Sequence, residues 1–275
     1  MIILTCMLLS GCRERQAVAS KTCSPERIAS LAPNITEIVT ALGLSGRLMG
    51  VTSQCNWPVE VSSRPKVGAF WYPNLEAIIA IRPDLVIGLE IPSHCLVAAR
   101  LQRLGYRCLL LRMDRLEDLF AAIRGIGEAA DCTVQAKGLC DELEGRIMSH
   151  GEARPRRPRV LFVVQRRPLR VAGPGTFIHQ AIELAGGANA VSVSPYRYPP
   201  ISTEQVLVAS PEVIIEPAGV EDVTCLANDP FWAMYWQVPA VACGRIYQVN
   251  QDLVSRLGPR IADGIAQIAR CLDGM

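Results

Sequence analysis

Short apolar runs alternate with segments of helical periodicity along most of this chain. In the first part, apolar runs predict strands at 27–32, 47–52, 85–88 and 108–111. Apolar residues recurring every three or four positions predict helices at 35–42, 75–81 and 96–104. Asn34 with Glu37 three residues later is typical of a helix N-cap and its capping box. Strands and helices in alternation indicate a parallel sheet and therefore an α/β fold.

The same alternation starts again after a helical middle section. Residues 116–130 and 134–148 have helical periodicity with no strong break between them, and the basic, proline-rich run 154–158 is typical of a boundary. Beyond it the pattern predicts strands 159–164, 213–216 and 246–249 and helices 176–184, 206–209 and 259–272. We therefore expect an N-terminal α/β lobe at 27–130, a connecting helix at 131–153 and a C-terminal α/β lobe at 154–275.

The N-terminus differs from the rest. Residues 1–9 are mostly apolar and lead into Leu9-Ser10-Gly11-Cys12, which resembles the site cut by the lipoprotein signal peptidase. The resemblance implies a signal segment at 1–12, a diacylated Cys12 and a polar tether at 13–26, although the segment lacks the usual basic start. The alternative is an ordinary buried element with an ordinary cysteine. No apolar run reaches the roughly 18–20 residues that span a bilayer.

Composition excludes several classes of protein. The 275 residues are 50% hydrophobic and 20% charged, a composition typical of a globular protein. The net charge of +2 gives no reason to expect a nucleic-acid partner.

The cysteines and histidines do not form a recognisable metal or redox motif. The eleven cysteines include no CxxC pair; without Cys6 and Cys12 nine remain, most of them in apolar stretches typical of core thiols. Three histidines, of which His94 falls on an expected loop, are not spaced as a metal site, so we expect none.

Two segments repeat the same pattern 128 residues apart. Asn74-Leu75-Glu76 precedes a short helix, a proline and an apolar strand, and Ser202-Thr203-Glu204 does the same. One interpretation is that each glutamate only serves the dipole of its own helix. The other is that the lobes are similar, in which case Glu76 and Glu204 are equivalent acids suited to two equivalent basic sites on a symmetric partner.

The ensemble of motifs over residues 27–272 resembles the periplasmic binding proteins for iron–siderophores, haem and vitamin B12. The motifs include residues 28–37, 65–68, 82–87, 185–189 and 258–261, together with the two repeats. The resemblance implies two α/β lobes joined by a single long helix, a ligand cleft between them, and no enzymatic activity. It also implies a periplasmic or cell-surface location and docking of Glu76 and Glu204 on an ABC permease dimer. We expect a monomer.

The ligand is expected to be a ferric siderophore, haem or cobalamin, carried as cargo rather than held as a cofactor. Loops at strand ends should line the cleft. The candidate contacts are Gln54, Trp57, Phe70, Trp71, Tyr72, Arg166, Arg170, Tyr198 and Arg256. By resemblance, Phe70 and Tyr198 match aromatic positions of the B12 binder, whereas Gln54 replaces an aromatic. Arginine side chains suit an anionic chelate, so the set favours a siderophore or haem, unless these arginines are merely solvated.

Two other functions compete with transport. Gly173-Pro174-Gly175-Thr176 is a glycine-rich turn before a helix, a feature of some phosphate-binding enzymes. It lacks the lysine of a P-loop and the spacing of a dinucleotide fingerprint, so it is more typical of a plain turn. The second alternative is a lipoprotein that kept the fold for binding or signalling without transport; retention of both Glu76 and Glu204 speaks against it.

Overall fold

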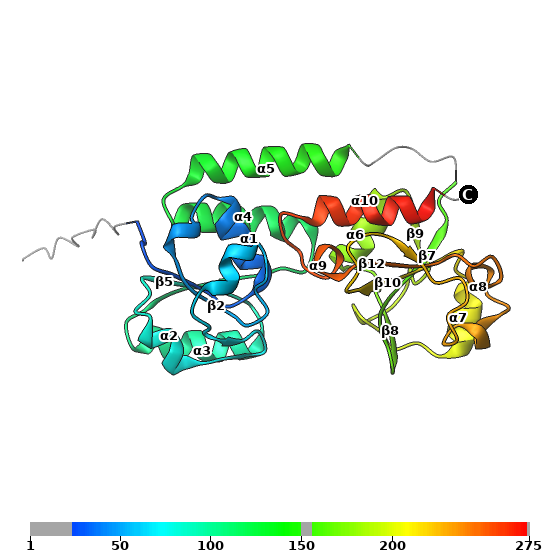
Figure 1. The fold of residues 1–275 in the computed structure, drawn as a ribbon, viewed down its shortest axis with the longest axis horizontal. Coiled ribbons are helices and arrows are strands. Elements are labelled where there is room, and N and C mark those ends of the chain that lie inside the picture. The colour runs from blue at the N-terminus through cyan, green and yellow to red at the C-terminus, as the bar shows by residue number, and fades with distance from the viewer. Residues whose placement is uncertain (1–23, 150–155, 274–275) are drawn as a thin grey trace, which may run out of the picture.

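The computed structural model describes residues 24–149 and 156–273. Within them the chain forms two α/β lobes side by side, each built on its own sheet (Figure 1). The expected signal segment 1–12 with Cys12 lies outside the described residues, as do Cys23 and all but the last three residues of the tether 13–26. No helix in the described ranges is both long enough and apolar enough to cross a membrane.

Four parallel strands form the sheet of the N-terminal lobe in the order β2-β1-β5-β6. They are β1 Ile28–Ser30, β2 Leu48–Val51, β5 Leu85–Leu89 and β6 Arg107–Leu111. The helices are α1 Pro33–Ala41, α2 Leu75–Ala80, α3 Pro92–Arg103 and α4 Leu116–Ala129, with 3-10 turns at Ser45–Arg47 and Val59–Ser63. A small hairpin pairs β3 Gly68–Ala69 with β4 Tyr72–Pro73. The central strands are buried, which explains why their sequences lack polar alternation.

The C-terminal lobe repeats this arrangement and adds antiparallel edges. Its strands are β7 Arg159–Arg166, β8 Leu169–Val171, β9 Ala188–Asn189, β10 Val213–Ala218, β11 Thr224–Cys225 and β12 Ile246–Asn250. Its helices are α6 Phe177–Leu184, α7 Thr203–Ala209, α8 Pro239–Ala242, α9 Gln251–Val254 and α10 Ile261–Leu272, with a 3-10 turn at Ala233–Tyr235. The parallel strands β9-β7-β10-β12 pair in the same relative order as β2-β1-β5-β6.

The sequence repeat has the same geometry in both lobes. Asn74 caps α2 by accepting a hydrogen bond from the backbone N–H of Ala77, and Ser202 caps α7 in the same way from Gln205. After each helix the chain passes through one residue of left-handed conformation, Arg82 (φ 46°) or Ser210 (φ 43°), directly before the proline.

An arginine at the start of each lobe fixes this turn. The side chain of Arg27 donates to the carbonyl of Arg82, and Arg159 donates to that of Ser210. The acids that follow the prolines, Asp84 and Glu212, each accept a hydrogen bond at 3.0 Å from the backbone N–H of the corresponding arginine. The repeat is therefore a structural unit present twice.

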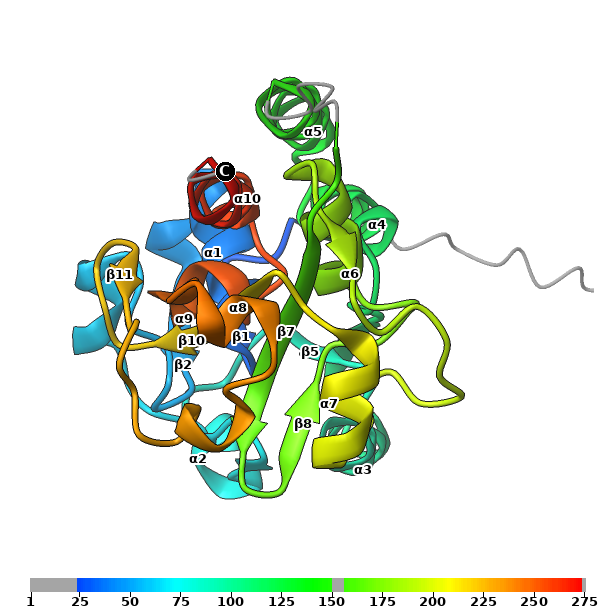
Figure 2. The ribbon, with the colours of Figure 1, turned by 90° about the vertical axis from the view of Figure 1, so that its right-hand side faces the viewer.

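Helix α5, Thr133–Met148, packs on α4 of the first lobe and α10 of the second (Figures 1 and 2). The helical stretch is broken, against expectation, because Asp131 adopts a positive φ of 56°. The chain then folds back, so that α4 and α5 lie side by side. A Cβ on Gly127 would lie 2.4 Å from that of Ala136, so glycine is required at this crossing. Residues 150–153 of the expected connecting helix lie outside the described ranges.

Two local predictions were wrong. Helix α1 begins at Pro33 with Ala32 as its N-cap and no side-chain cap, so Asn34 and Glu37 form no capping box. A proline at the first helical position suits its fixed φ, and the two polar side chains are used in contacts with the other lobe. Helix α3 begins at Pro92 rather than at residue 96, so His94 lies buried in its first turn and not on a loop.

The cysteines are only partly core residues. The eight that lie in the described ranges are all free thiols. Cys55, Cys132, Cys140 and Cys271 are buried, Cys108 is partly buried, and Cys95, Cys225 and Cys243 are exposed. The prediction that cysteines in apolar stretches are core residues therefore holds for about half of these eight.

Candidate functional site

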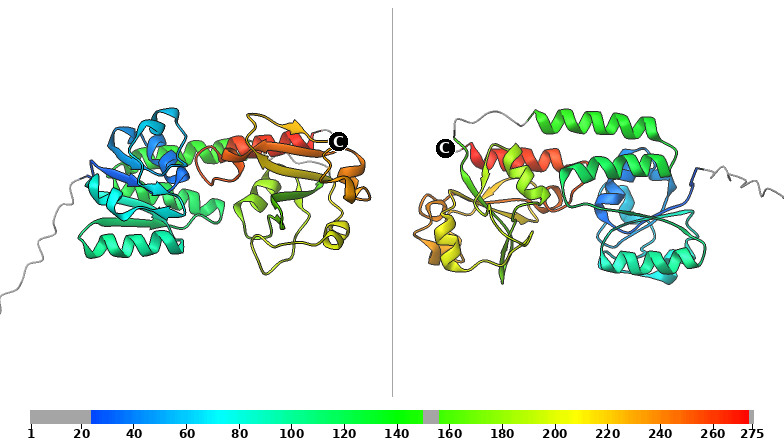
Figure 3. Two further views of the ribbon diagram at one scale, coloured as in Figure 1. Left: turned by 60° about the horizontal axis from the view of Figure 1, so that its bottom comes forward. Right: turned by 180° about the vertical axis from the view of Figure 1, so that it is seen from behind.

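A cavity of about 560 Å³ lies between the two lobes. Figure 3 shows the arrangement of the lobes from two further sides. On the N-terminal side it is lined by residues that end or follow the parallel strands: Asn34 after β1, Gln54 after β2, Leu89 at the end of β5 and Met113 after β6. Phe70 and Trp71 join them from the β3–β4 turn. The C-terminal lobe contributes Phe177, Gln251, Asp252 and Arg256, among others. Carboxyl ends of parallel strands are the usual place for a ligand in such folds.

The aromatic turn is held in place by two side chains. Gln54 Oε1 accepts a hydrogen bond of 2.9 Å from the backbone N–H of Phe70. His94 contacts the carbonyl of Phe70 through Nε2 at 2.7 Å, while its Nδ1 accepts from the N–H of Leu89 at 3.0 Å. Because Nδ1 is an acceptor, the proton of the neutral ring lies on Nε2, which donates to Phe70. The rings of Phe70 and Trp71 meet edge to face, with their centroids 4.6 Å apart. The hydrogen bonds to the backbone of Phe70 therefore help to position both rings.

Burial lowers the pKa of His94, and the hydrogen bond to Phe70 opposes this shift only in part. The imidazole is therefore neutral near pH 7, in the form that both hydrogen bonds require. His94 thus supports the site without touching a ligand.

The charged side chains of the cavity are already paired. Arg256 donates to Asn56 Oδ1 at 2.6 Å and forms an ion pair of 2.8 Å with Asp252. Asp252 also accepts from Asn56 Nδ2 at 2.8 Å. These contacts join helix α9 and the residues after it to the loop that follows β2. The two charged side chains that line the cavity, Asp252 and Arg256, are therefore paired with each other.

Four of the expected contact residues line this cavity: Gln54, Phe70, Trp71 and Arg256. The other five lie elsewhere. Trp57 lies beneath the guanidinium of Arg260, 4.7 Å from it, and lines a different hollow beside α5. Tyr72 is exposed on β4. Arg170 donates to the carbonyl of Tyr198.

Arg166 is a structural residue. Its guanidinium donates to Glu216 at 2.9 and 2.6 Å and to Asp229 at 2.7 Å, and it lies over the ring of Phe231. The hydrogen bonds that Arg166 donates to Glu216 raise the pKa of its guanidinium. Four of the five N–H donors of Arg166 are used on Glu216 and Asp229, so its charge is already balanced by two carboxylates within the lobe.

Tyr198 marks a second contact between the lobes. Burial and the neighbouring carboxylate of Asp114 raise the pKa of its hydroxyl to about 12. Arg197 pairs with Asp114, and the backbone N–H of Phe177 donates to the carbonyl of Asp114 at 2.8 Å. The loop 112–115 thus connects the first lobe to the second next to Met113 and Phe177, which line the cavity.

Sequence reasoning missed several lining residues: Asn34, Leu89, Met113, Phe177 and Gln251. The signal that finds the first three is their place directly after, or at the end of, a predicted parallel strand. No such signal marks Phe177, which begins a helix.

A profile of the periplasmic binding protein family matches residues 28–253, which covers both lobes and the cavity between them. This chain belongs to the periplasmic binding protein family. Members of this family are the extracytoplasmic solute-binding components of ABC importers and work with a permease; they are not enzymes.

Relatives span nearly the whole chain. The vitamin B12-binding protein of Pectobacterium carotovorum subsp. carotovorum (strain PC1) is 28% identical, covering 91% of this chain and 90% of that protein. An uncharacterized ABC transporter substrate-binding lipoprotein of Bacillus subtilis (strain 168) is 27% identical, covering 90% and 80%. Among solved structures, the periplasmic haem-binding protein of Roseiflexus sp. RS-1 in apo form has a TM-score of 0.77 at 26% identity, covering 90% of this chain and 97% of that one.

Glu76 and Glu204 occupy equivalent places on this periplasmic binding protein. Both are exposed in the first turn of their helices, α2 and α7, which lie on the side of the molecule away from α5 (Figures 1 and 2). Neither forms an ion pair within the described ranges. A hydrogen bond from Ser202 lowers the pKa of Glu204, so its carboxylate stays charged at neutral pH.

Proposed function

We propose that this protein captures a corrinoid such as cobalamin outside the cytoplasm and delivers it to an ABC permease dimer. The observation that carries the proposal is the interlobe cavity, where aromatic and apolar side chains meet uncharged amides while the single lining arginine is already paired. Gln54 and Gln251 supply the amides, and Phe70 and Trp71 supply the aromatic surface. Aromatic faces suit a flat macrocycle, and amides suit the amide groups at its edge.

A ferric siderophore fits this cavity less well. The expectation of an anionic ligand depended largely on arginine side chains, but Arg166 and Arg170 do not line the cavity. Arg256, which does, is balanced by Asp252. A cavity with no net positive charge offers an anion little compensation for its lost hydration.

Haem is the second candidate, supported by the similarity to the haem-binding protein of Roseiflexus. Haem iron in proteins is usually held by a histidine, tyrosine, cysteine or methionine side chain. Met113 is the one such side chain among the lining residues. The corrinoid is preferred because its cobalt brings its own ligands, so the cavity need not supply a metal-binding side chain; the similarity to the B12-binding protein of Pectobacterium agrees with this preference.

The remaining features of transport are part of the same proposal. Cys12 carries a lipid anchor, and the lipoprotein of Bacillus subtilis supports this assignment. The protein works as a monomer whose Glu76 and Glu204 pair with basic residues on the two permease subunits.

The test is a fluorescence titration of residues 24–275 with cobalamin, haemin and ferric siderophores, corrected for absorption by each chelate. Trp71 lines the cavity, whereas Trp57 is stacked under Arg260 outside it. Saturable quenching by cobalamin that W71F removes and W57F retains is the expected result. Saturation by haemin or a siderophore alone would overturn the corrinoid assignment, and no response to any chelate would overturn chelate capture.

A further inference from the structure

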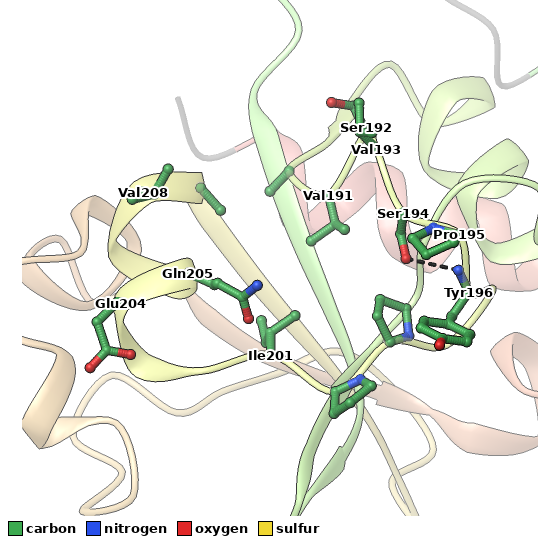
Figure 4. A pocket seen from close by; sticks show the side chains of 14 residues that line it. Val191, Ser192, Val193, Ser194, Pro195, Tyr196, Ile201, Glu204, Gln205 and Val208 are labelled. Atoms are coloured by element: carbon green, nitrogen blue, oxygen red, sulfur yellow. Dashed lines mark hydrogen bonds between the residues drawn. The ribbon is translucent and has the colours of Figure 1, made fainter.

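A second pocket, of about 580 Å³, lies on the surface of the C-terminal lobe between helix α7 and the loop 190–196 (Figure 4). It shares no lining residue with the interlobe cavity. Its two walls carry Val208 on α7 and Val193 on the loop, with Ile201 between them (Figure 4). Val193 is 90% exposed and Val208 86% exposed, although both are apolar. Apolar side chains gathered around a surface hollow are typical of an interaction site.

Two polar groups of this pocket form hydrogen bonds within the protein. Gln205 Oε1 accepts a hydrogen bond of 2.8 Å from the backbone N–H of Ser202 in the capping box of α7. Ser194 Oγ accepts one of 3.0 Å from the N–H of Tyr196. Most of the other lining residues are alanine, valine, isoleucine or proline, so the pocket suits an apolar group.

Glu204 is the one charged residue among those that line this pocket. Glu204 lies on the helix that forms one wall, and its carboxylate points away from Ile201 and Gln205 (Figure 4). It has no ion-pair partner in the part of the chain that the structure describes. An apolar hollow with an unpaired carboxylate at its rim is complementary to an apolar side chain next to a basic one.

We propose that this pocket receives an apolar side chain of a permease subunit, presented beside the basic residue that pairs with Glu204. The proposal rests on the docking role of Glu204 given above and adds an anchor to it. A buried apolar anchor contributes most of the affinity of an interface, while the charge at its edge steers the encounter. The anchor belongs to the C-terminal half, because α2 carries the smaller Ala80 at the position that corresponds to Val208.

The experiment measures binding of the full chain to its permease complex in lipid nanodiscs. V208D and V193D each place a charge on one wall of the pocket and should weaken binding about tenfold or more. V134D is the matched control: Val134 is also an exposed valine, but it lies on α5 at the opposite side of the molecule. Cobalamin affinity and melting temperature of each variant show that fold and cavity are intact.

Normal binding by V208D and V193D, together with weakened binding by E204R, would overturn the anchor and leave the docking role in place. Normal binding by E204R and E76R as well would overturn the docking role itself. A concentration-dependent dimer of the isolated protein that V208D abolishes, measured by sedimentation, would assign the pocket to a second copy of this chain and also overturn the proposal.

Discussion

Glu37 in helix α1 accepts two hydrogen bonds from the guanidinium of Arg260, which lies 223 residues further along the chain in the other lobe. Arg260 Nε lies 3.0 Å from Oε2 and Nη2 lies 2.6 Å from Oε1. Glu37 is only 3% exposed, and Arg256 approaches the same carboxylate at 3.6 Å. With the nearby hydrogen bond from Asn34 to the carbonyl of Leu257, this pair fixes how the lobes face each other.

Removing the charge of Glu37 should therefore be costly. In E37Q the two arginines lose their shared counter-charge in a largely buried place, and we expect the free energy of unfolding in urea to fall by about 3 kcal/mol. D141N is the control, because Asp141 pairs with Lys137 on the exposed face of α5, where solvent screens the pair and its contribution to stability is small. Equal stability of E37Q and D141N would show that the buried pair does not stabilise the lobe contact.

His94 should make the protein sensitive to mild acid. Its pKa is below the ordinary 6.5 in the folded state because of burial, so between the two values the unfolded chain binds a proton that the folded chain does not. Stability should therefore rise with pH across this window and decline as pH falls below 6.5. Protonation also turns Nδ1 into a donor facing the N–H of Leu89, which breaks that hydrogen bond.

The check is a series of urea unfolding curves from pH 7.5 to 5, compared with H94Q. The free energy of unfolding of the wild-type protein should fall over this range. H94Q should be less stable at pH 7.5, and its free energy of unfolding should depend less on pH because the contribution of His94 is absent. Identical slopes for the two proteins would contradict the assignment. Weaker cobalamin binding by H94Q at pH 7.5 is expected too, since Phe70 loses one of the two side-chain hydrogen bonds that hold it in place.

Local features of the chain predicted much of the fold. The prolines at 83 and 211, the caps at Asn74 and Ser202 and the apolar strands after them are all signals within a few residues of the structure they specify. The structure confirms them and adds the left-handed residues Arg82 and Ser210, which sequence alone did not reveal.

The site was harder to predict because side-chain partners lie far apart in sequence. Arg166 was expected to face a ligand, but its partners Glu216 and Asp229 are 50 and 63 residues away. Asn34 and Glu37 matched a local capping pattern, yet their partners lie in the other lobe. The rule that ligands bind at the carboxyl ends of parallel strands led to Gln54, which lines the interlobe cavity.

Lipid anchoring makes a separate prediction. If Cys12 is acylated, C12A should appear in the soluble extracytoplasmic fraction, whereas the wild-type chain should sediment with membranes. C95A is a suitable control because Cys95 is an exposed free thiol on α3. Membrane association of C12A equal to that of wild type would contradict the anchor.

Charge reversal tests the docking glutamates directly. E76R and E204R each remove an exposed carboxylate that has no ion pair within residues 24–149 and 156–273, so the melting temperature should fall only slightly, through the lost charge at the helix N-terminus. Together they place positive charge opposite the basic sites expected on the permease, and uptake of cobalamin by cells should be abolished while affinity for the ligand is unchanged. E144R is the control, since Glu144 is an exposed acid on α5, on the side away from α2 and α7 (Figure 1).

Because charges at the rim of an interface act largely on the association rate, each single variant should bind the permease more slowly than the wild-type protein. The difference in rate should be smaller at high salt. Unimpaired uptake by the double variant would show that the two equivalent acids serve only their own helices.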